Sequence, residues 1–186
     1  MTLLLLGLLL FTAVHLVPSL APGIKSAWLG QLGENGYKGT FSLLLVAGLV
    51  LIVFGWRGTV PEFVYRPPAG LHFPALALVF LGFLLFVVSN RKSRLRRLVR
   101  HPQLTGVCLW GIAHLMLNGD NRSLLLFGGL TLWAIVEIVA INRRDGIWIK
   151  DEAPDWGTEI VTLVITAVVI GVIIAAHPWL SGRPVW

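Results

Sequence analysis

The feature that most constrains this chain is a series of six apolar runs. They cover residues 2–17, 40–56, 71–89, 104–117, 123–141 and 158–176. A helix needs roughly 17 to 25 apolar residues to cross the hydrocarbon core of a bilayer, so the first and fourth runs are short and the others suffice. Inside lipid only helices and closed barrels satisfy their own backbone hydrogen bonds. The runs therefore predict an all-α fold, a polytopic transmembrane helix bundle of about six helices that forms one domain over residues 1–186.

The ends of the runs predict how the helices begin and connect. The fourth run can be lengthened through Pro102, because proline is tolerated in the first turn of a helix, and through Asn118 at the far end. The first run has the length of a signal peptide, but it lacks a basic start and a small-x-small cleavage site, so we expect it to stay as the first helix. Residues 18–39 are expected to form a loop on the inner surface, and residues 61–70 an extended connection.

The charged residues predict the orientation of the bundle. The net charge is +6, and much of it lies in RKSRLRRLVR, residues 91–100, directly after the third apolar run. Basic residues beside a span mark the cytoplasmic side, where anionic lipid headgroups are their neighbours. Alternation then places the arginine pair of residues 141–146 inside, and residues 118–122 and the N-terminus outside. The bilayer is the expected partner, and nucleic acid is not.

Two of the five histidines lie deep in apolar runs. His72, His101 and His177 stand at the ends of runs, where water or lipid headgroups can solvate them. With a rise of 1.5 Å per residue, His114 lies about 16 Å from the inner end of its helix, and His15 roughly 10 Å from the inner end of the first helix. Helix tilt can absorb this difference, so the two imidazoles can approach a common point.

The donor set around the deep histidines suits haem better than zinc. Zinc normally takes four ligands, and the sequence places no further histidine, cysteine or carboxylate cluster at this depth. The single cysteine, Cys108, is expected to be a small core residue and excludes an internal disulfide. Haem needs only one or two axial ligands from the protein, typically histidine. The alternative, that His15 and His114 are core residues hydrogen-bonded within the bundle, fits the spacing equally well.

The helix face around His114 carries further candidate cofactor contacts. Steps of three and four residues place Gln103, Val107, Trp110, Gly111, His114 and Asn118 on one stripe. Glycine permits close approach, and tryptophan offers a flat wall. Ordinary helix packing explains the glycine, but not a histidine with two amides. We therefore expect Gln103, Trp110, Gly111 and Asn118 to line a cofactor site.

A second polar cluster is expected near the inner surface. Arg100 and His101 precede the fourth run, and Glu137 lies about one turn inside the inner end of the fifth. A carboxylate in an apolar run is costly unless it is paired, so Glu137 is expected to meet an arginine or a histidine. An ion pair that fixes the bundle and a catalytic role are both open for this residue.

Three stretches carry a family resemblance over nearly the whole chain. LGENGYKGTFSLLLVAGLVLIVFGWR, RHPQLTGVCLWGIAHLMLNGDNRSLLLFGGLTLWAI and the closing HPWLSGRPV resemble the NnrU family of bacterial membrane proteins. That family is similar to 15-cis-zeta-carotene isomerase, a haem b membrane enzyme. The isomerase has the same arginine, histidine, proline and glutamine run, followed by a histidine spaced as His114 is from His101. It also has a histidine in its first matching helix, where His15 stands.

The resemblance implies a haem b with His15 and His114 as axial ligands, with Arg100 and His101 as further cofactor contacts. It also implies a multi-pass protein of the bacterial inner membrane. In the isomerase, reduction of the haem is understood to release one histidine so that the iron meets a polyene, and by analogy nitric oxide is a second possible ligand. The family's name comes from clusters concerned with nitrogen-oxide respiration.

Two other classes of function stay open at the level of sequence. Arg100-His101-Pro102 with Gly106 also resembles the S-adenosylmethionine site of isoprenylcysteine and thiol methyltransferases, although Leu104 replaces the tyrosine of that motif. Glu137 would then correspond to the acidic residue in the second S-adenosylmethionine-binding motif of those enzymes. The other class is a haem-bearing, non-enzymatic partner of a respiratory complex, or a homo-oligomer. A Soret band would favour haem, and tight S-adenosylmethionine binding without colour would favour methyl transfer.

Overall fold

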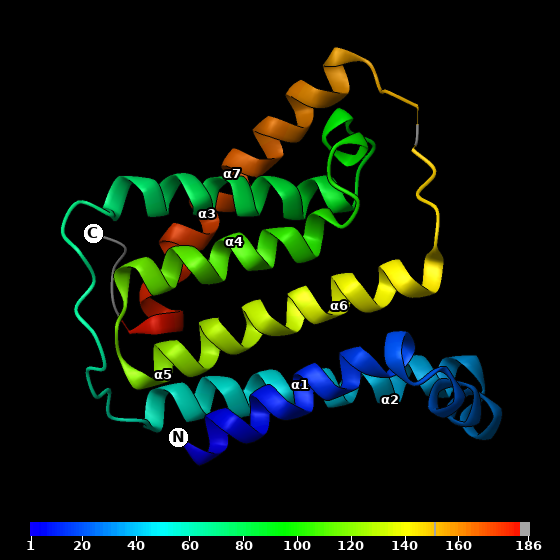
Figure 1. Ribbon diagram of the computed structural model, residues 1–186, viewed down its shortest axis with the longest axis horizontal. Helices are drawn as coiled ribbons and strands as arrows, with labels where there is room; N and C mark the ends of the chain where they lie inside the picture. The colour runs from blue at the N-terminus through cyan, green and yellow to red at the C-terminus, as the bar shows by residue number, and fades with distance from the viewer. Residues whose placement is uncertain (151, 183–186) are drawn as a thin grey trace.

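The computed structural model describes residues 1–150 and 152–182, and it confirms an all-α membrane bundle (Figure 1). The elements are α1 (Thr2–Leu20), α2 (Pro22–Gly58), α3 (His72–Ser89), the 3-10 turn η1 (Arg94–Arg97), α4 (Pro102–Leu117), α5 (Asn121–Ser123), the π-helical η2 (Leu124–Gly128), α6 (Gly129–Asp145) and α7 (Trp156–Ser181). α5, η2 and α6 form one continuous stretch. Five helices are long and apolar enough to span a membrane, and α4 is a shorter apolar helix. Each of the six predicted runs is therefore helical.

The ends of the helices agree with the prediction at the start of α4 and differ from it at the end of α4 and at α2. α4 begins at Pro102, as the sequence predicts, but it ends at Leu117, and Asn118 is its extended C-cap and not a part of the helix. Residues 22–39, however, are helical and belong to α2, so the predicted inner loop is wrong. Gly33 interrupts α2 with φ 67° and ψ 178°, a conformation that glycine adopts without steric cost. The chain thus turns by a kink inside a helix and not by an irregular loop.

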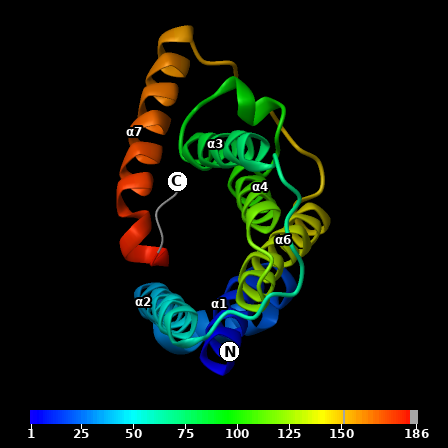
Figure 2. The same cartoon turned by 90° about the vertical axis from the view of Figure 1, so that its left-hand side faces the viewer.

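The helices pack in the spatial order α2, α1, α6, α4, α3, α7 (Figure 2). α1 with α2 and α3 with α4 form two tight pairs, and α6 lies between α1 and α4. α7 packs on α3, and the Arg57 guanidinium of α2 donates a hydrogen bond of 2.5 Å to the carbonyl of Trp179 near the end of α7. This arrangement places α6 between the helices that carry His15 and His114.

Close backbone approach holds the α3 and α4 pair together. A Cβ atom on Gly106 would lie 2.6 Å from the carbonyl oxygen of Gly82, so neither position has room for a side chain. Small residues at a crossing let two membrane helices gain van der Waals contact that lipid cannot provide. The glycines of the fourth run therefore serve helix packing, and α4 becomes a fixed support for the residues on its other faces.

The two ends of the bundle separate the polar segments as the charge pattern predicts. η1, the α1–α2 junction and the connection from α6 to α7 lie at one end, and the N-terminus, α5 and the α2–α3 connection lie at the other (Figure 1). The basic residues 91–100 and the arginines at the end of α6 thus share one end. That this end faces the cytoplasm stays a prediction.

Candidate functional site

Both deep histidines use the same ring nitrogen, Nδ1, for a hydrogen bond within their own helix. Nδ1 of His15 lies 2.9 Å from the carbonyl oxygen of Phe11, and Nδ1 of His114 lies 2.8 Å from that of Trp110. A carbonyl oxygen only accepts, so Nδ1 must carry the proton and donate in both residues. In the neutral ring the lone pair is then on Nε2, for which the described residues offer no hydrogen-bond partner. This tautomer is the one that metal-ligating histidines commonly adopt.

Aromatic side chains surround both imidazoles inside the bundle. The His15 ring lies 4.3 Å from Phe11, 5.0 Å from Trp133 and 6.0 Å from Phe41, measured between centroids. The His114 ring stacks on Phe127 at 4.4 Å and 26°, with Trp110 at 4.7 Å. Both rings therefore pack against flat apolar side chains of neighbouring helices and do not project into lipid alone.

The two imidazoles face the same continuous helix at different heights. His15 contacts Trp133 of α6, and His114 contacts Phe127 of η2, six residues earlier. Six residues correspond to about 9 Å along a helix. No ring contact joins the two histidines among the described residues. His177, near the end of α7, lies within electrostatic range of His114 and forms a 3.1 Å contact from Nδ1 to Ser181 Oγ.

The stripe predicted around His114 divides into residues with different neighbours. Trp110 contacts His114 directly, and Asn118 donates from Nδ2 to the His114 carbonyl at 2.9 Å, which caps the helix end. Gly111 faces α6, where a Cβ atom would lie 2.1 Å from Thr131 Oγ1. Gln103 is exposed at the other end of α4. The structure thus brings Trp110 and Asn118 to His114, fills the space at Gly111 with α6, and leaves Gln103 remote.

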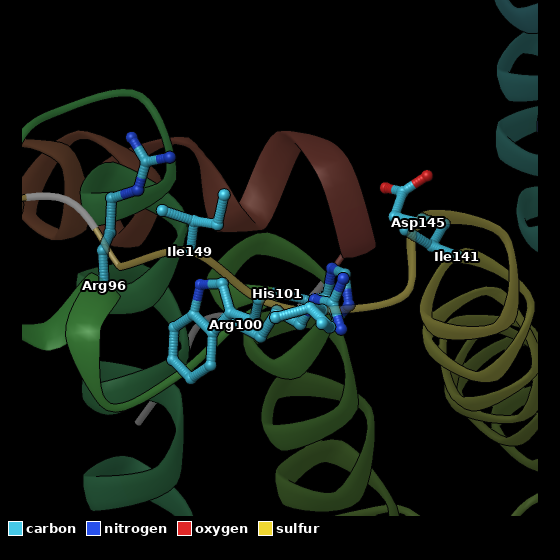
Figure 3. Close-up of a pocket in the computed structure, with 8 residues that line it drawn as sticks. Arg96, Arg100, His101, Ile141, Asp145 and Ile149 are labelled. Atoms are coloured by element: carbon cyan, nitrogen blue, oxygen red, sulfur yellow. The ribbon is translucent and has the colours of Figure 1, made fainter.

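Arg100 and His101 form a separate polar region at the basic end of the bundle. Arg100 donates from Nη1 to the carbonyl of Gly146 at 2.7 Å, and His101 Nε2 lies 2.9 Å from Asn142 Oδ1. Both residues line a pocket of about 430 Å³ between the segment before α4 and the end of α6 (Figure 3). His101 and His114 are separated by about 20 Å along α4. The structure therefore does not bring these two predicted contacts to the deep histidines.

Glu137 is buried, and its partner differs from the prediction. Ser19 of α1 donates from Oγ to Glu137 Oε2 at 2.8 Å. Arg144 lies within electrostatic range but donates to Asp145 and to the Pro18 carbonyl. The hydrogen-bond partner is therefore a serine and not an arginine or a histidine. The reason is the packing of α1 on α6, which sets Ser19 beside Glu137 one turn after it sets His15 beside Trp133.

The sequence reasoning missed a buried ion pair at the other end of the bundle. Asp120 accepts from the backbone nitrogen and hydroxyl of Ser123 at 3.0 and 2.9 Å, and lies 3.5 Å from Arg122 Nε. The Arg122 guanidinium stacks over Trp56 at 4.3 Å. The signal was the polar NGDNRS between two apolar runs, but only the fold shows that this turn is buried against α2.

Comparison with known proteins gives one family. The model of the family described as NnrU protein matches residues 3–185. No curated protein and no solved structure matches the chain. The match covers nearly the whole sequence, including both deep histidines and all helical residues described above except Thr2. The chain belongs to the NnrU family of membrane proteins.

Proposed function

We propose that this protein binds one haem b within the bundle, with His114 and His15 as axial ligands. The observation that carries the proposal is the pair of Nδ1–H···O=C bonds, at 2.8 and 2.9 Å, which leaves an Nε2 lone pair on each ring. Both residues are half-buried, and neither Nε2 is among the buried polar atoms of the described residues that lack a partner, so each unpaired nitrogen is open to a ligand.

The residues around the two rings suit a flat, largely apolar cofactor. Phe127, Trp110, Phe11 and Trp133 offer aromatic faces. The indole N–H of Trp133 is buried and has no hydrogen-bond partner among the described residues, so it can donate to a polar group bound beside His15. When bound, haem b would supply a redox-active iron that can accept a further ligand, which the side chains of the protein cannot provide.

The chain's own residues then act by holding and orienting the imidazoles. The carbonyls of Phe11 and Trp110 fix the tautomer and raise the basicity of Nε2. Phe127 and Trp110 exclude water from the His114 side. Glu137 acts as a positioning residue, because its bond to Ser19 fixes α1 one turn away from His15.

Two reactions fit this arrangement, in the cytoplasmic membrane of a bacterium as the resemblance implies. Cis–trans isomerisation of an apolar polyene is favoured by the aromatic side chains around both imidazoles, within a bundle of apolar helices. Nitrogen-oxide-linked chemistry, with nitric oxide as the ligand, is supported by the family resemblance. Methyl transfer is not favoured, since Glu137 does not line the pocket at Arg100 and His101.

The test is an absorption spectrum of protein purified from haem-sufficient cells, oxidised and reduced. We expect a Soret band, and a pyridine haemochrome assay that gives one haem b per chain. Colourless protein, or identical low-spin spectra after His15→Ala and His114→Ala, would refute the proposal. Nitric oxide titration of the reduced protein and polyene turnover by the same sample then separate the two reactions. If neither reaction is seen and the protein co-purifies with an oxidoreductase while it retains haem, the result would indicate a respiratory partner.

A further inference from the structure

The pocket at the basic end of the bundle points to a second ligand site. It is formed by Arg96, Arg100 and His101 on one side, and by the end of α6 with the following segment on the other (Figure 3). About 430 Å³ is enough for a small polar group such as a phosphate ester with its glycerol. The pocket lies about 20 Å from His114 along α4. Its lining residue Ile141 lies about 12 Å along α6 from Trp133, which packs on His15, so the pocket is not a part of the proposed haem site.

The electrostatics of this pocket favour an anion. Arg100 donates to the neutral carbonyl of Gly146, and that bond does not neutralise the charge of the guanidinium. Asp145 is the one carboxylate among the described residues that line the pocket. It pairs with Arg144 through contacts of 2.7 and 3.3 Å and also lies within electrostatic range of Arg100 and His101, so one negative charge faces several cations. Arginine presents several donors in a plane, which suits the oxygens of a phosphate.

The rim of the pocket is built to lie in lipid headgroups. Ile147 and Ile149 are 91% and 86% exposed, and they flank Trp148, over whose ring the Lys150 ammonium lies at 4.9 Å. In water two such isoleucines would each leave a large apolar surface exposed. Between two membrane-spanning helices they can instead reach the acyl chains, while tryptophan and lysine occupy the interface as they commonly do.

We propose that this pocket binds the phosphate of an anionic phospholipid from the adjoining leaflet. Arg100 contacts the phosphate, and Ile147 and Ile149 contact the acyl chains. A phospholipid and free phosphate would both contact Arg100. Only the phospholipid has acyl chains that would contact Ile147 and Ile149. The site would hold the α6–α7 connection against the segment that precedes α4.

The test measures lipid selectivity of the full chain in nanodiscs, with spin-labelled phosphatidylglycerol and phosphatidylcholine as probes. We expect the unmodified chain to favour phosphatidylglycerol and Arg100→Gln to lower that preference about fivefold, the effect of one surface cation on an anionic lipid. Arg97→Gln is the matched control, because Arg97 is exposed in the same segment and does not line the pocket. Arg100→Lys keeps the charge and should keep the preference.

Three results would overturn the proposal. One is an equal loss of preference in Arg100→Gln and Arg97→Gln, which would mean a diffuse surface charge. Another is displacement of the lipid by millimolar inorganic phosphate with no effect of Ile147→Ser and Ile149→Ser combined, which would mean a site for free phosphate. The last needs no variant and so does not depend on folding: a headgroup series on the unmodified chain that shows no preference for phosphatidylglycerol over phosphatidylcholine.

Discussion

The two deep histidines are tied to their own helices in the same way but stand in different surroundings. Each donates from Nδ1 to the carbonyl four residues earlier. His114 lies on α4, which is fixed against α3 at Gly106 and against α6 at Gly111, and its ring stacks on Phe127. His15 lies on α1, edge-on to Trp133, with Phe41 of α2 at 6.0 Å. Glycine crossings also fix α1 against α2, at Gly7 and Gly55. The difference therefore lies in the rings, since a stacked contact holds the His114 ring and only tilted and edge contacts hold the His15 ring.

The buried carboxylate nearest to each histidine also differs, in the number of groups that donate hydrogen bonds to it. On the His114 side, Asp120 has two hydrogen-bond donors from Ser123 and an ion pair with Arg122. On the His15 side, Glu137 has the single hydroxyl of Ser19 as its hydrogen-bond donor. A buried charge with several donors is a structural anchor, whereas one with a single donor leaves its helix easier to move.

The largest expected effect is the loss of haem when His114 is removed. His114→Ala should abolish haem retention, because the ligand whose ring is held by the stacked Phe127 is gone. His15→Ala should retain less haem and leave it five-coordinate, since His114 still presents Nε2. The measurement is the ratio of Soret to protein absorbance, with the spin state from the visible bands of the oxidised protein.

His72→Ala is the matched control for these variants, because His72 is exposed at the start of α3 and contacts Phe73 alone among the described ring pairs. It should keep the spectrum of the unmodified chain. Full haem retention in His114→Ala, with loss only in His15→Ala, would reverse the comparison and make α1 the principal support.

The next effect in size concerns the two carboxylates. Asp120→Ala leaves the Arg122 guanidinium buried without its ion-pair partner and should cost about 3 to 5 kcal/mol of stability. Ser19→Ala leaves Glu137 without its hydrogen-bond donor and should cost about 1 to 3 kcal/mol. Thermal unfolding in detergent, followed by circular dichroism, compares them. A larger loss from Ser19→Ala would show that the α1–α6 contact, and not the Asp120 turn, anchors the bundle.

A smaller effect is expected where α4 meets α6. Gly111→Ala places a methyl group 2.1 Å from Thr131 Oγ1 and 2.9 Å from the Phe127 carbonyl, so the helices must separate at a cost of about 1 to 3 kcal/mol. The control is Gly128→Ala, since a Cβ atom there meets no atom within 4 Å and its φ of −65° is helical. That variant should be neutral or gain up to about 1 kcal/mol. Equal stability of the two variants would contradict a tight α4–α6 contact behind His114.

The sequence predicts where the helices of this fold lie along the chain better than it predicts which segments pack against each other. Apolar length alone placed all six runs, and the tolerance of proline in a first turn correctly began α4 at Pro102. Residues 22–39 were misjudged because their glycines and charges resemble a loop, whereas a single left-handed residue, Gly33, lets two helical segments join. Hydropathy measures transfer to lipid and says little about a helical segment that is less apolar than the spans.

The site shows the same limit at the level of single residues. Depth in the membrane picked out His15 and His114, and the helical stripe picked out Trp110 and Asn118, which do contact His114. The same stripe included Gln103, because spacing along one helix does not say which helices cover it. Ser19 as the partner of Glu137 depends on the register of α1 against α6, which no local pattern in either run encodes.

The smallest expected effect is a shifted titration of Tyr65, which ties the α2–α3 connection to the end of α4. Burial, followed by the charge of Asp120, raises the pKa of this phenol above its ordinary value of 10.0. Its hydroxyl donates to the carbonyls of Leu115 and Asn118, and a phenolate could not. Below pH 10 the phenol is protonated in both folded and unfolded chains, so it adds no pH dependence. Above that value the unfolded chain releases its proton first, and stability should fall as the pH rises.

The chain has two tyrosines, which makes this titration measurable. Tyr37→Phe leaves only Tyr65 to absorb as tyrosinate near 295 nm, and its midpoint should lie above 10.0. Tyr65→Phe leaves only Tyr37, and it should remove the part of the alkaline loss of stability that comes from the phenol. Asp120→Asn should move the Tyr65 midpoint down by less than burial moves it up, because the carboxylate is the smaller of the two causes. A Tyr65 midpoint at or below the ordinary value would mean that water reaches the end of α4, and the support inferred for α4 would then rest on the glycine crossings alone.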